Sequence, residues 1–145
     1  MDTFEWTEET PVTANNMNEM QNILNNNIEE TVSNQVVLTT NGNAVPTGRK
    51  IDGNTEYVKR IALNDFPDTN QTETWDTGIN MTNLIMTDLK VTVKSGSGNW
   101  FLLPNNDSVN SRVQLNSSGY VSVTMYTGNL NGNNGYAEVY YYYTS

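Results

Sequence analysis

The sequence has 145 residues, a formal net charge of −9 and a pI near 4.2, so attraction to nucleic acid phosphates or to anionic lipid is not expected. The chain contains no cysteine and no histidine, which excludes disulfides, cysteine nucleophiles, Ser-His-Asp triads and His/Cys zinc sites. Only 36% of the residues are hydrophobic. Either the chain buries these few side chains very completely, or neighbouring subunits complete its core. We favour the neighbouring subunits.

The first residues predict neither a signal peptide nor a membrane anchor. Residues 1–11 are acidic and contain no apolar h-region. No apolar run in the chain approaches the roughly 20 residues that a membrane span needs. We therefore expect a protein that is made in the cytosol, is not exported by the usual route and does not insert into membranes.

Residues 1–32 are predicted to be an anchor segment that contains a short N-terminal α-helix. Pro11 disfavours helix at the residue before it, Thr13 can cap the helix, and the helix runs from Ala14 to about Thr31. Its apolar residues recur at spacings of three and four and form one stripe: Met17, Met20, Ile23, Leu24, Ile28 and Val32. An isolated, asparagine-rich helix is marginal in water, so the stripe needs a partner. That partner is either the body of the same chain or, as we favour, further copies of the helix in a bundle.

Residues 33–54 are predicted to be a connector. Residues 35–39 have the composition of a short strand, whereas residues 41–48 are turn-forming residues throughout. A second turn signal, Asp52-Gly53-Asn54, leads into the body of the protein.

From residue 55 onward the apolar residues alternate with period two, which predicts β-strands. The clearest alternation covers residues 84–94, and its phase slips once near Asp88, which predicts a bulge or bend. The other predicted strands are residues 55–63, 72–76, 100–103, 112–116, 120–126 and 136–144. Short strands between Gly- and Asn-rich turns predict a mostly β head over residues 55–145, an antiparallel β-sandwich or jelly-roll-like fold.

Four consecutive tyrosines lie inside the last predicted strand. Tyr140 and Tyr142 share one face of the strand, and Tyr141 and Tyr143 share the other, because successive side chains alternate. One interpretation gives one face to the core and the other to solvent. The interpretation that we favour makes the second face, Tyr141 and Tyr143, a subunit interface, since tyrosine is enriched at interfaces.

Two stretches of the chain resemble small trimeric bacteriophage fibre, baseplate and head-fibre proteins. The first is the tripeptide Phe4-Glu5-Trp6 followed by Thr10-Pro11-Val12-Thr13-Ala14-Asn15-Asn16-Met17-Asn18, which opens the predicted helix. The second resembles the β heads of phage fibres through the order of its cues: Thr77-Gly78-Ile79, Asn83-Leu84-Ile85, Trp100-Phe101-Leu102-Leu103-Pro104 and Gly135-Tyr136-Ala137-Glu138-Val139-Tyr140-Tyr141. Together these stretches cover about two-thirds of the chain, which lacks the longer shaft of most such proteins.

The resemblance implies a virion protein, a homotrimer that docks on larger virion proteins through its N-terminus and turns its β head outward. It supplies no catalytic residues. The residues expected to form the anchor or oligomer seam are Trp6, Met17, Met20, Leu24 and Ile28.

Two acidic pairs and one acidic turn are candidates for chemistry, and each is better explained by structure. Glycoside hydrolysis needs two carboxylates that flank the scissile bond, but Asp65 with Asp68 and Glu73 with Asp76 lie in predicted turns or edges, where carboxylates are usually solvated or cap backbone groups. The segment 52–56 offers oxygen ligands that calcium accepts but lacks the rest of an EF-hand loop. We therefore predict no enzyme activity, no cofactor and no metal.

Exposed aromatic rings and asparagines are the candidates for contact with a host-surface glycan. Trp75, Trp100 and Tyr120 could form a platform for sugar rings. Trp100 lies in an apolar run and is predicted to be core, so Trp75 is the better candidate. The loop at residues 129–135 adds amide donors and acceptors, and the predicted receptor contacts are Trp75, Asn131, Asn133 and Asn134.

The sequence thus favours a bacteriophage fibre or adhesin without enzymatic activity. A monomeric carbohydrate-binding module is the alternative, and a small glycan depolymerase comes third. The helix separates the first two, because a monomeric module has little use for an asparagine-rich helix with one apolar stripe.

Overall fold

The computed structural model describes residues 18–23, 37–104 and 109–145. The chain divides into two compact units, residues 1–36 and residues 37–145. In the first unit, residues 18–23 are helical, and Met20 and Ile23 are exposed. The remainder of the predicted helix and the seam residues Trp6, Met17, Leu24 and Ile28 lie outside the described residues. No helix among the described residues is long and apolar enough to cross a membrane.

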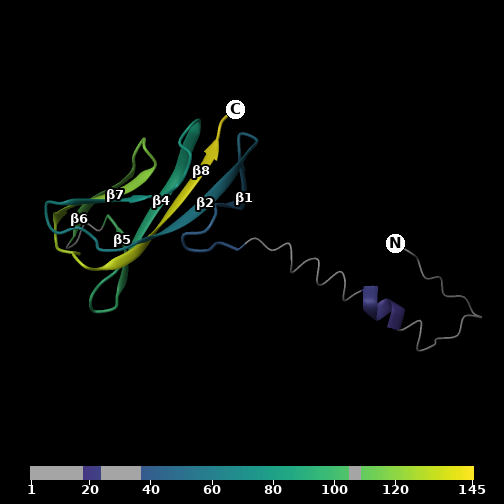
Figure 1. Cartoon of the computed structure of the whole chain (residues 1–145), viewed down its shortest axis with the longest axis horizontal. Helices are drawn as coiled ribbons and strands as arrows, with labels where there is room; N and C mark the ends of the chain where they lie inside the picture. Colours follow the sequence, from purple (N-terminus) through teal and green to yellow (C-terminus); the bar gives the residue numbers. More distant parts are fainter. Residues whose placement is uncertain (1–17, 24–36, 105–108) are drawn as a thin grey trace, which may run out of the picture. The chain divides into compact units, whose positions relative to one another are not determined.

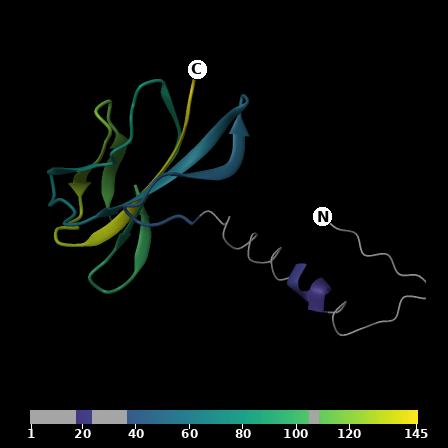
Figure 2. The ribbon, with the colours of Figure 1, turned by 45° about the vertical axis from the view of Figure 1, so that its right-hand side comes forward.

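The second unit is mostly β and consists of antiparallel sheets (Figure 1). Its strands are, in chain order, β1 (Val45–Ile51), β2 (Asn54–Leu63), β3 (Thr72–Asp76), β4 (Leu84–Lys94), β5 (Trp100–Leu103), β6 (Asn110–Leu115), β7 (Tyr120–Thr127) and β8 (Asn134–Tyr143). A five-stranded sheet has the order β1-β2-β8-β4-β5, and a three-stranded sheet has the order β3-β7-β6. The turn of the β1–β2 hairpin lies away from the three-stranded sheet (Figure 1, Figure 2).

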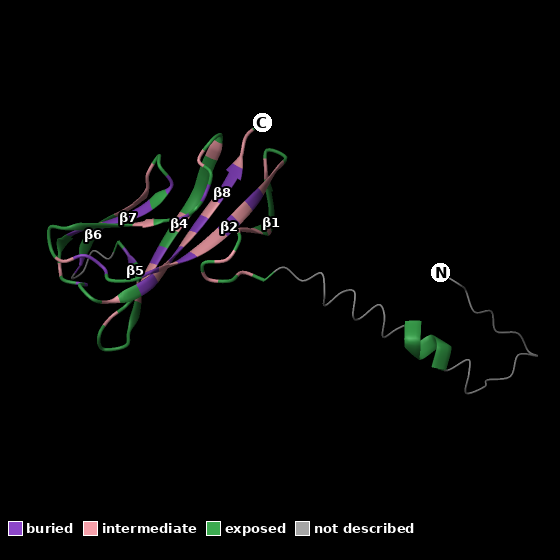
Figure 3. Cartoon of the chain, in the orientation of Figure 1, coloured by how far each residue is buried: buried purple, intermediate pink, exposed green. Residues whose placement is uncertain are grey.

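Both sheets contribute to one hydrophobic core, an arrangement consistent with a β-sandwich. Val121 and Val123 of β7 are fully buried, as are Val91 of β4 and Val139 of β8. Burial alternates along the strands because successive side chains point to opposite faces (Figure 3). Phe66, in the β2–β3 connection, is also fully buried. The described residues of this unit thus bury one continuous core within the chain, and the expectation that neighbouring subunits complete it stays a prediction.

Period-two patterning predicted the strands from β2 to β8, with ends that differ by at most two residues. The phase slip predicted near Asp88 is confirmed, because the register of β4 against β8 shifts between Met86 and Asp88. That shift is a β-bulge: β4 has one extra, unpaired residue between Met86 and Asp88. The side chains of β4 beyond it therefore point to the opposite faces of the sheet from those that strict alternation would give.

The prediction of turn structure across residues 41–48 is wrong where β1 begins. β1 pairs antiparallel with β2 through a two-residue turn at Asp52 and Gly53. Both turn residues have positive φ, 50° and 80°, as a type I′ hairpin turn requires, so the turn predicted there is confirmed. Pro46 and Gly48 are tolerated because β1 is an edge strand whose register is irregular between Pro46 and Lys50. Residues 37–39 are not in a strand.

Glu56 of β2 is a buried carboxylate that ties three strands together. Its Oε1 accepts a hydrogen bond from Thr47 Oγ1 at 2.9 Å, and its Oε2 accepts one from Thr87 Oγ1 at 2.7 Å. Arg49 Nε lies 3.7 Å from Oε1. The hydrogen bond from Thr87 is the largest cause that holds the pKa of Glu56 below its ordinary value of 4.5; burial opposes it, and Thr47 and Arg49 reinforce it. The described residues contain no group of three or more acidic side chains that could hold a metal ion.

In the tyrosine run, the side chains of Tyr141 and Tyr143 point toward the core. Tyr141 is only 4% exposed and stacks on Tyr57, with ring centroids 6.1 Å apart. The prediction that Tyr141 lies at a subunit interface is therefore wrong, because Ala137 and Val139 of the same face already point into the core. Tyr143 packs against the same core, and its hydroxyl donates to Asn80 O at 2.9 Å.

Candidate functional site

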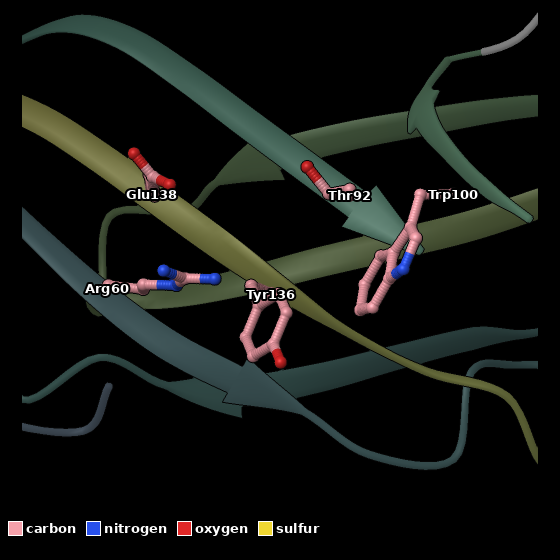
Figure 4. A pocket seen from close by; sticks show the side chains of 5 residues that line it. All are labelled: Arg60, Thr92, Trp100, Tyr136 and Glu138. Atoms are coloured by element: carbon pink, nitrogen blue, oxygen red, sulfur yellow. The ribbon is translucent and has the colours of Figure 1, made fainter. Parts of the chain in front are cut away.

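Two adjoining open pockets lie on the face of the five-stranded sheet that points away from the core. The first has a volume of about 300 Å³, and its lining residues are Arg60, Thr92, Trp100, Tyr136 and Glu138 (Figure 4). The second has a volume of about 260 Å³ and shares Trp100 and Tyr136 with the first. Its polar lining residues are Asn64, Lys94 and Asn134. The shared aromatic pair makes these two pockets one candidate site, the Trp100 pocket.

Strand register brings these residues together from four strands. Ala62 of β2 and Thr92 of β4 flank Tyr136 of β8 in register, and their short side chains leave space beside its ring. The turn after β4 closes with a hydrogen bond from Ser95 N to Asn99 O at 2.8 Å. It returns the chain as β5, which places Trp100 opposite Lys94.

The aromatic pair is ordered by contacts within the protein. The rings of Trp100 and Tyr136 are stacked with centroids 5.5 Å apart and an interplanar angle of 11°. The guanidinium carbon of Arg60 lies 4.1 Å from the Tyr136 centroid, and Tyr136 lies between Arg60 and Trp100 (Figure 4). Stacked aromatic pairs contribute about 0.5–1.5 kcal/mol, and exposed cation–π contacts contribute about 0.5–1 kcal/mol. The pocket is therefore preorganised, while Trp100 remains 50% exposed.

The charged groups of the pocket are not paired with each other. Arg60 and Glu138 are opposite in the β2–β8 register, yet among the described residues Arg60 forms no ion pair within 4.0 Å, and its buried Nε has no hydrogen-bond partner. Glu138 Oε2 instead accepts a hydrogen bond from the Tyr140 hydroxyl at 2.8 Å. Burial raises the pKa of Tyr140 to about 12, and the hydrogen bond to Glu138 acts in the same direction. Tyr140 therefore stays a proton donor at neutral pH, and the guanidinium of Arg60 keeps donors available.

The pocket offers the chemistry of binding. Its lining groups include an indole, a guanidinium, an ammonium, two amides and the hydroxyls of Thr92 and Tyr136. Such groups stack on a ligand or exchange hydrogen bonds with it. Glu138 is the one carboxylate among the lining residues, whereas glycoside hydrolysis uses two.

The acidic pairs considered as catalytic candidates serve local backbone structure. Asp68 Oδ1 accepts a hydrogen bond from Thr69 N at 2.9 Å, and Asp76 Oδ1 accepts one from Gly78 N at 2.8 Å. These are the capping roles expected for aspartate at turns.

The structure exposes Trp100 and packs Trp75 against the core. Trp75 packs on Phe66 with ring centroids 5.5 Å apart, and its Nε1 donates to Asn64 O at 3.0 Å. Trp75 is thus partly buried against the core, while the prediction that Trp100 is core is wrong. β5 alternates: Leu103 is buried and Phe101 packs on the core, so Trp100 points outward.

The asparagine loop only partly reaches the pocket. Leu130 is 4% exposed and fixes the loop to the core, and Asn131 N donates to Asn129 Oδ1 at 2.8 Å. Of the predicted contacts Trp75, Asn131, Asn133 and Asn134, only Asn134 lines the Trp100 pocket. Sequence reasoning missed Arg60, Tyr136 and Glu138, although the alternation of β8 around Ala137 and Val139 indicates that Tyr136 and Glu138 share a face.

Comparison with protein-family models, with curated proteins and with solved structures gives no match for this chain.

Proposed function

We propose that this protein is a structural component of a bacteriophage virion, a short homotrimeric fibre or adhesin without enzymatic activity. Residues 1–32 anchor it to larger virion proteins, and the β body attaches the particle to the host surface. The phage-like run that begins at Phe4 supports the anchor. The virion is then its site of action, after synthesis in the cytoplasm of the host bacterium.

One observation carries the attachment role: the β body holds an exposed, preorganised aromatic pocket. Trp100 and Tyr136 are stacked in advance of any ligand, and a sheet holds both, so little conformational freedom is lost on binding. The pocket belongs to a different compact unit from the anchor residues. Attachment and anchoring therefore use separate parts of the chain.

The finer fold that accompanies this proposal is a jelly-roll-like head behind a helix over residues 14–31. Nested strand pairing supports the jelly roll, because β2 pairs with β8 and β3 pairs with β7 in the other sheet. Such nested pairs arise when one long antiparallel hairpin folds over so that successive pairs of its strands lie in alternate sheets.

The trimer is tested at the helix. Met20 is exposed in the single chain and lies on the predicted seam, so Met20→Asp should lower the mass of the assembly from three times 16.2 kDa toward that of one chain. A buried unpaired charge is costly, whereas the β signal in circular dichroism should not change. Light scattering measures the mass, with the neighbouring Asn22→Asp as the control. A parent protein that is monomeric at micromolar concentration would contradict the trimer.

The attachment role is tested on the virion. Particles that carry Trp100→Ala should adsorb more slowly to host cells, whereas particles with Tyr126→Ala, an equally exposed aromatic ring on the other sheet, should adsorb normally. Equal adsorption of both variants and the parent would refute the role of the pocket in attachment.

A monomeric carbohydrate-binding module is the second candidate function. The observation that favours it is the core of the β body, whose largest fully buried side chains are those of Phe66, Leu63 and Met125. A core buried within one chain suits a protein that works as a monomer, so a monomeric parent protein would select this candidate.

A further inference from the structure

We infer that the Trp100 pocket binds an anionic glycan, a sugar ring that carries a carboxylate or a phosphate group. This inference rests on the proposed attachment role and deepens it by naming the chemistry of the ligand. It follows from the charge of the pocket, the unsatisfied guanidinium and the arrangement of stacking and polar groups.

The pocket is positive on an acidic protein. The chain has seven basic residues and a net charge of −9, yet Arg60 and Lys94 both line the pocket, where Glu138 is the one acidic lining residue. The Glu138 carboxylate already accepts the hydrogen bond of Tyr140. A cationic ligand would meet two positive side chains, whereas an anionic group meets favourable local charge. The acidic surroundings disfavour long polyanions such as nucleic acid, because these need many basic contacts.

Arg60 provides the contact for the anion. It stacks on Tyr136 and does not pair with a carboxylate of the described chain. Its Nε is buried without a hydrogen-bond partner, so the terminal guanidinium nitrogens are the donors that face a ligand in the pocket. A planar guanidinium matches the two oxygens of a carboxylate or phosphate, and such pairs are the strongest hydrogen bonds that arginine forms. The stack on Tyr136 holds the guanidinium in place, which lowers the entropy lost when an oxyanion binds.

The remaining groups fit the rest of a sugar. Trp100 is half exposed, and the part of its indole that Tyr136 and Lys94 leave open presents apolar surface to the apolar face of a pyranose. Thr92, Asn64 and Asn134 border the ring pair and offer donors and acceptors to hydroxyl groups. The volumes of about 300 Å³ and about 260 Å³ lie at or below the lower end of ligand pockets, which suits a small unit such as one sugar ring. A nucleotide also combines a flat ring with a phosphate. The sugar is favoured because Tyr136 lies between Arg60 and Trp100 (Figure 4), and the Trp100 ring has Tyr136 and Lys94 against it, so neither ring offers a full face to a base.

The test measures binding to the full chain by titration calorimetry. The ligands are two pairs of sugars, each with one charged and one neutral member, and one nucleotide. Trigalacturonate is compared with its methyl ester, which keeps the rings and removes the charge, and mannose 6-phosphate is compared with mannose. The two acids distinguish carboxylate from phosphate. Thymidine 5′-monophosphate tests the nucleotide. We expect at least one charged sugar to bind at least about tenfold more tightly than its neutral partner, with an affinity that falls as NaCl rises from about 50 to about 500 mM.

Variants assign the effect to the pocket. Arg60→Gln should remove the tenfold preference for the charged sugar, and Arg60→Lys should restore part of it. Arg112→Gln, which removes the same charge from an exposed site on the three-stranded sheet, should leave the preference unchanged. Thermal melting of each variant verifies that it is folded. Trp100→Ala should abolish binding of charged and neutral sugars alike.

Three outcomes would overturn the inference. Equal binding of a neutral sugar and its charged partner would show a neutral glycan site, and the attachment role would stand. Tighter binding of thymidine 5′-monophosphate would assign the pocket to nucleotides. Absence of binding for all probes up to about 10 mM would reject an anionic glycan as the ligand. The attachment role has its own test: normal adsorption of virions that carry Trp100→Ala would reject attachment through this pocket.

Discussion

Gly135, the one glycine among the residues that line the pocket, should be difficult to replace. It lies on β8, paired with Val93 of β4 and Leu63 of β2, and a Cβ at this position would collide with the backbone carbonyl of Thr92. Backbone in the middle of a sheet cannot move aside as the end of a flexible side chain can. Overpacking typically costs about 1–3 kcal/mol, so we expect Gly135→Ala to cost about 3 kcal/mol.

Thermal unfolding followed by circular dichroism measures this cost. For a unit of about 100 residues, 1 kcal/mol shifts Tm by roughly 4 °C or more, so Gly135→Ala should lower Tm by more than about 10 °C. Gly96→Ala is the matched control, because its Cβ would meet only Asn133 Oδ1 at 4.0 Å; it should stay within about 0.5 kcal/mol of the parent. A Gly135→Ala protein that melts within about 2 °C of the parent would refute the argument from close strand approach.

Three further predictions concern the body of the protein. Because the folded pKa of Glu56 is lowered, its contribution to stability is present above the unfolded value of 4.5 and is lost as pH falls through the folded pKa; urea midpoints across this range should fall for the parent and stay flatter for Glu56→Gln. Leu103→Ala leaves a cavity at a buried site and should lower the free energy of unfolding in urea by about 2–5 kcal/mol. Trp100→Ala should lower it by no more than about 1.5 kcal/mol. Equal losses would contradict the conclusion that Leu103 points inward and Trp100 outward on β5. Burial raises the pKa of Tyr141 to about 12, so its stabilisation holds below its ordinary value of 10.0 and is lost as pH rises toward 12. The stability difference between the parent and Tyr141→Phe should therefore stay constant below pH 10.0 and move against the parent above it, and a difference that already changes below pH 10.0 would contradict the raised pKa.

Local residue order was enough to predict the β-strands that follow residue 55. Alternation with period two depends only on the order of residues, because successive side chains of a strand point to opposite faces. Asp52-Gly53 forms a tight turn for a similarly local reason, since both residues accept positive φ. The bulge near Asp88 was visible as a break in alternation. These features need no knowledge of distant neighbours.

Which face of each strand is buried depends on how the two sheets pack. Alternation groups Tyr141 with Tyr143, and Trp100 with Leu102, but it does not say which group meets the opposite sheet. The three-stranded sheet settles this, because its valines on β7 cover the face that carries Ala137 and Val139. Tyr141 is therefore buried and Trp100 is exposed, the reverse of what composition suggested.

The site itself was beyond the sequence because its parts are far apart in the chain. Arg60, Trp100 and Tyr136 come from β2, β5 and β8, and only the strand order β2-β8-β4-β5 brings them onto one surface. β1 was missed for a related reason: Pro46 and Gly48 disfavour a strand locally, whereas the backbone groups of β2 provide the partner that makes one. Strand pairing is a long-range interaction, so residue order alone could not determine either feature.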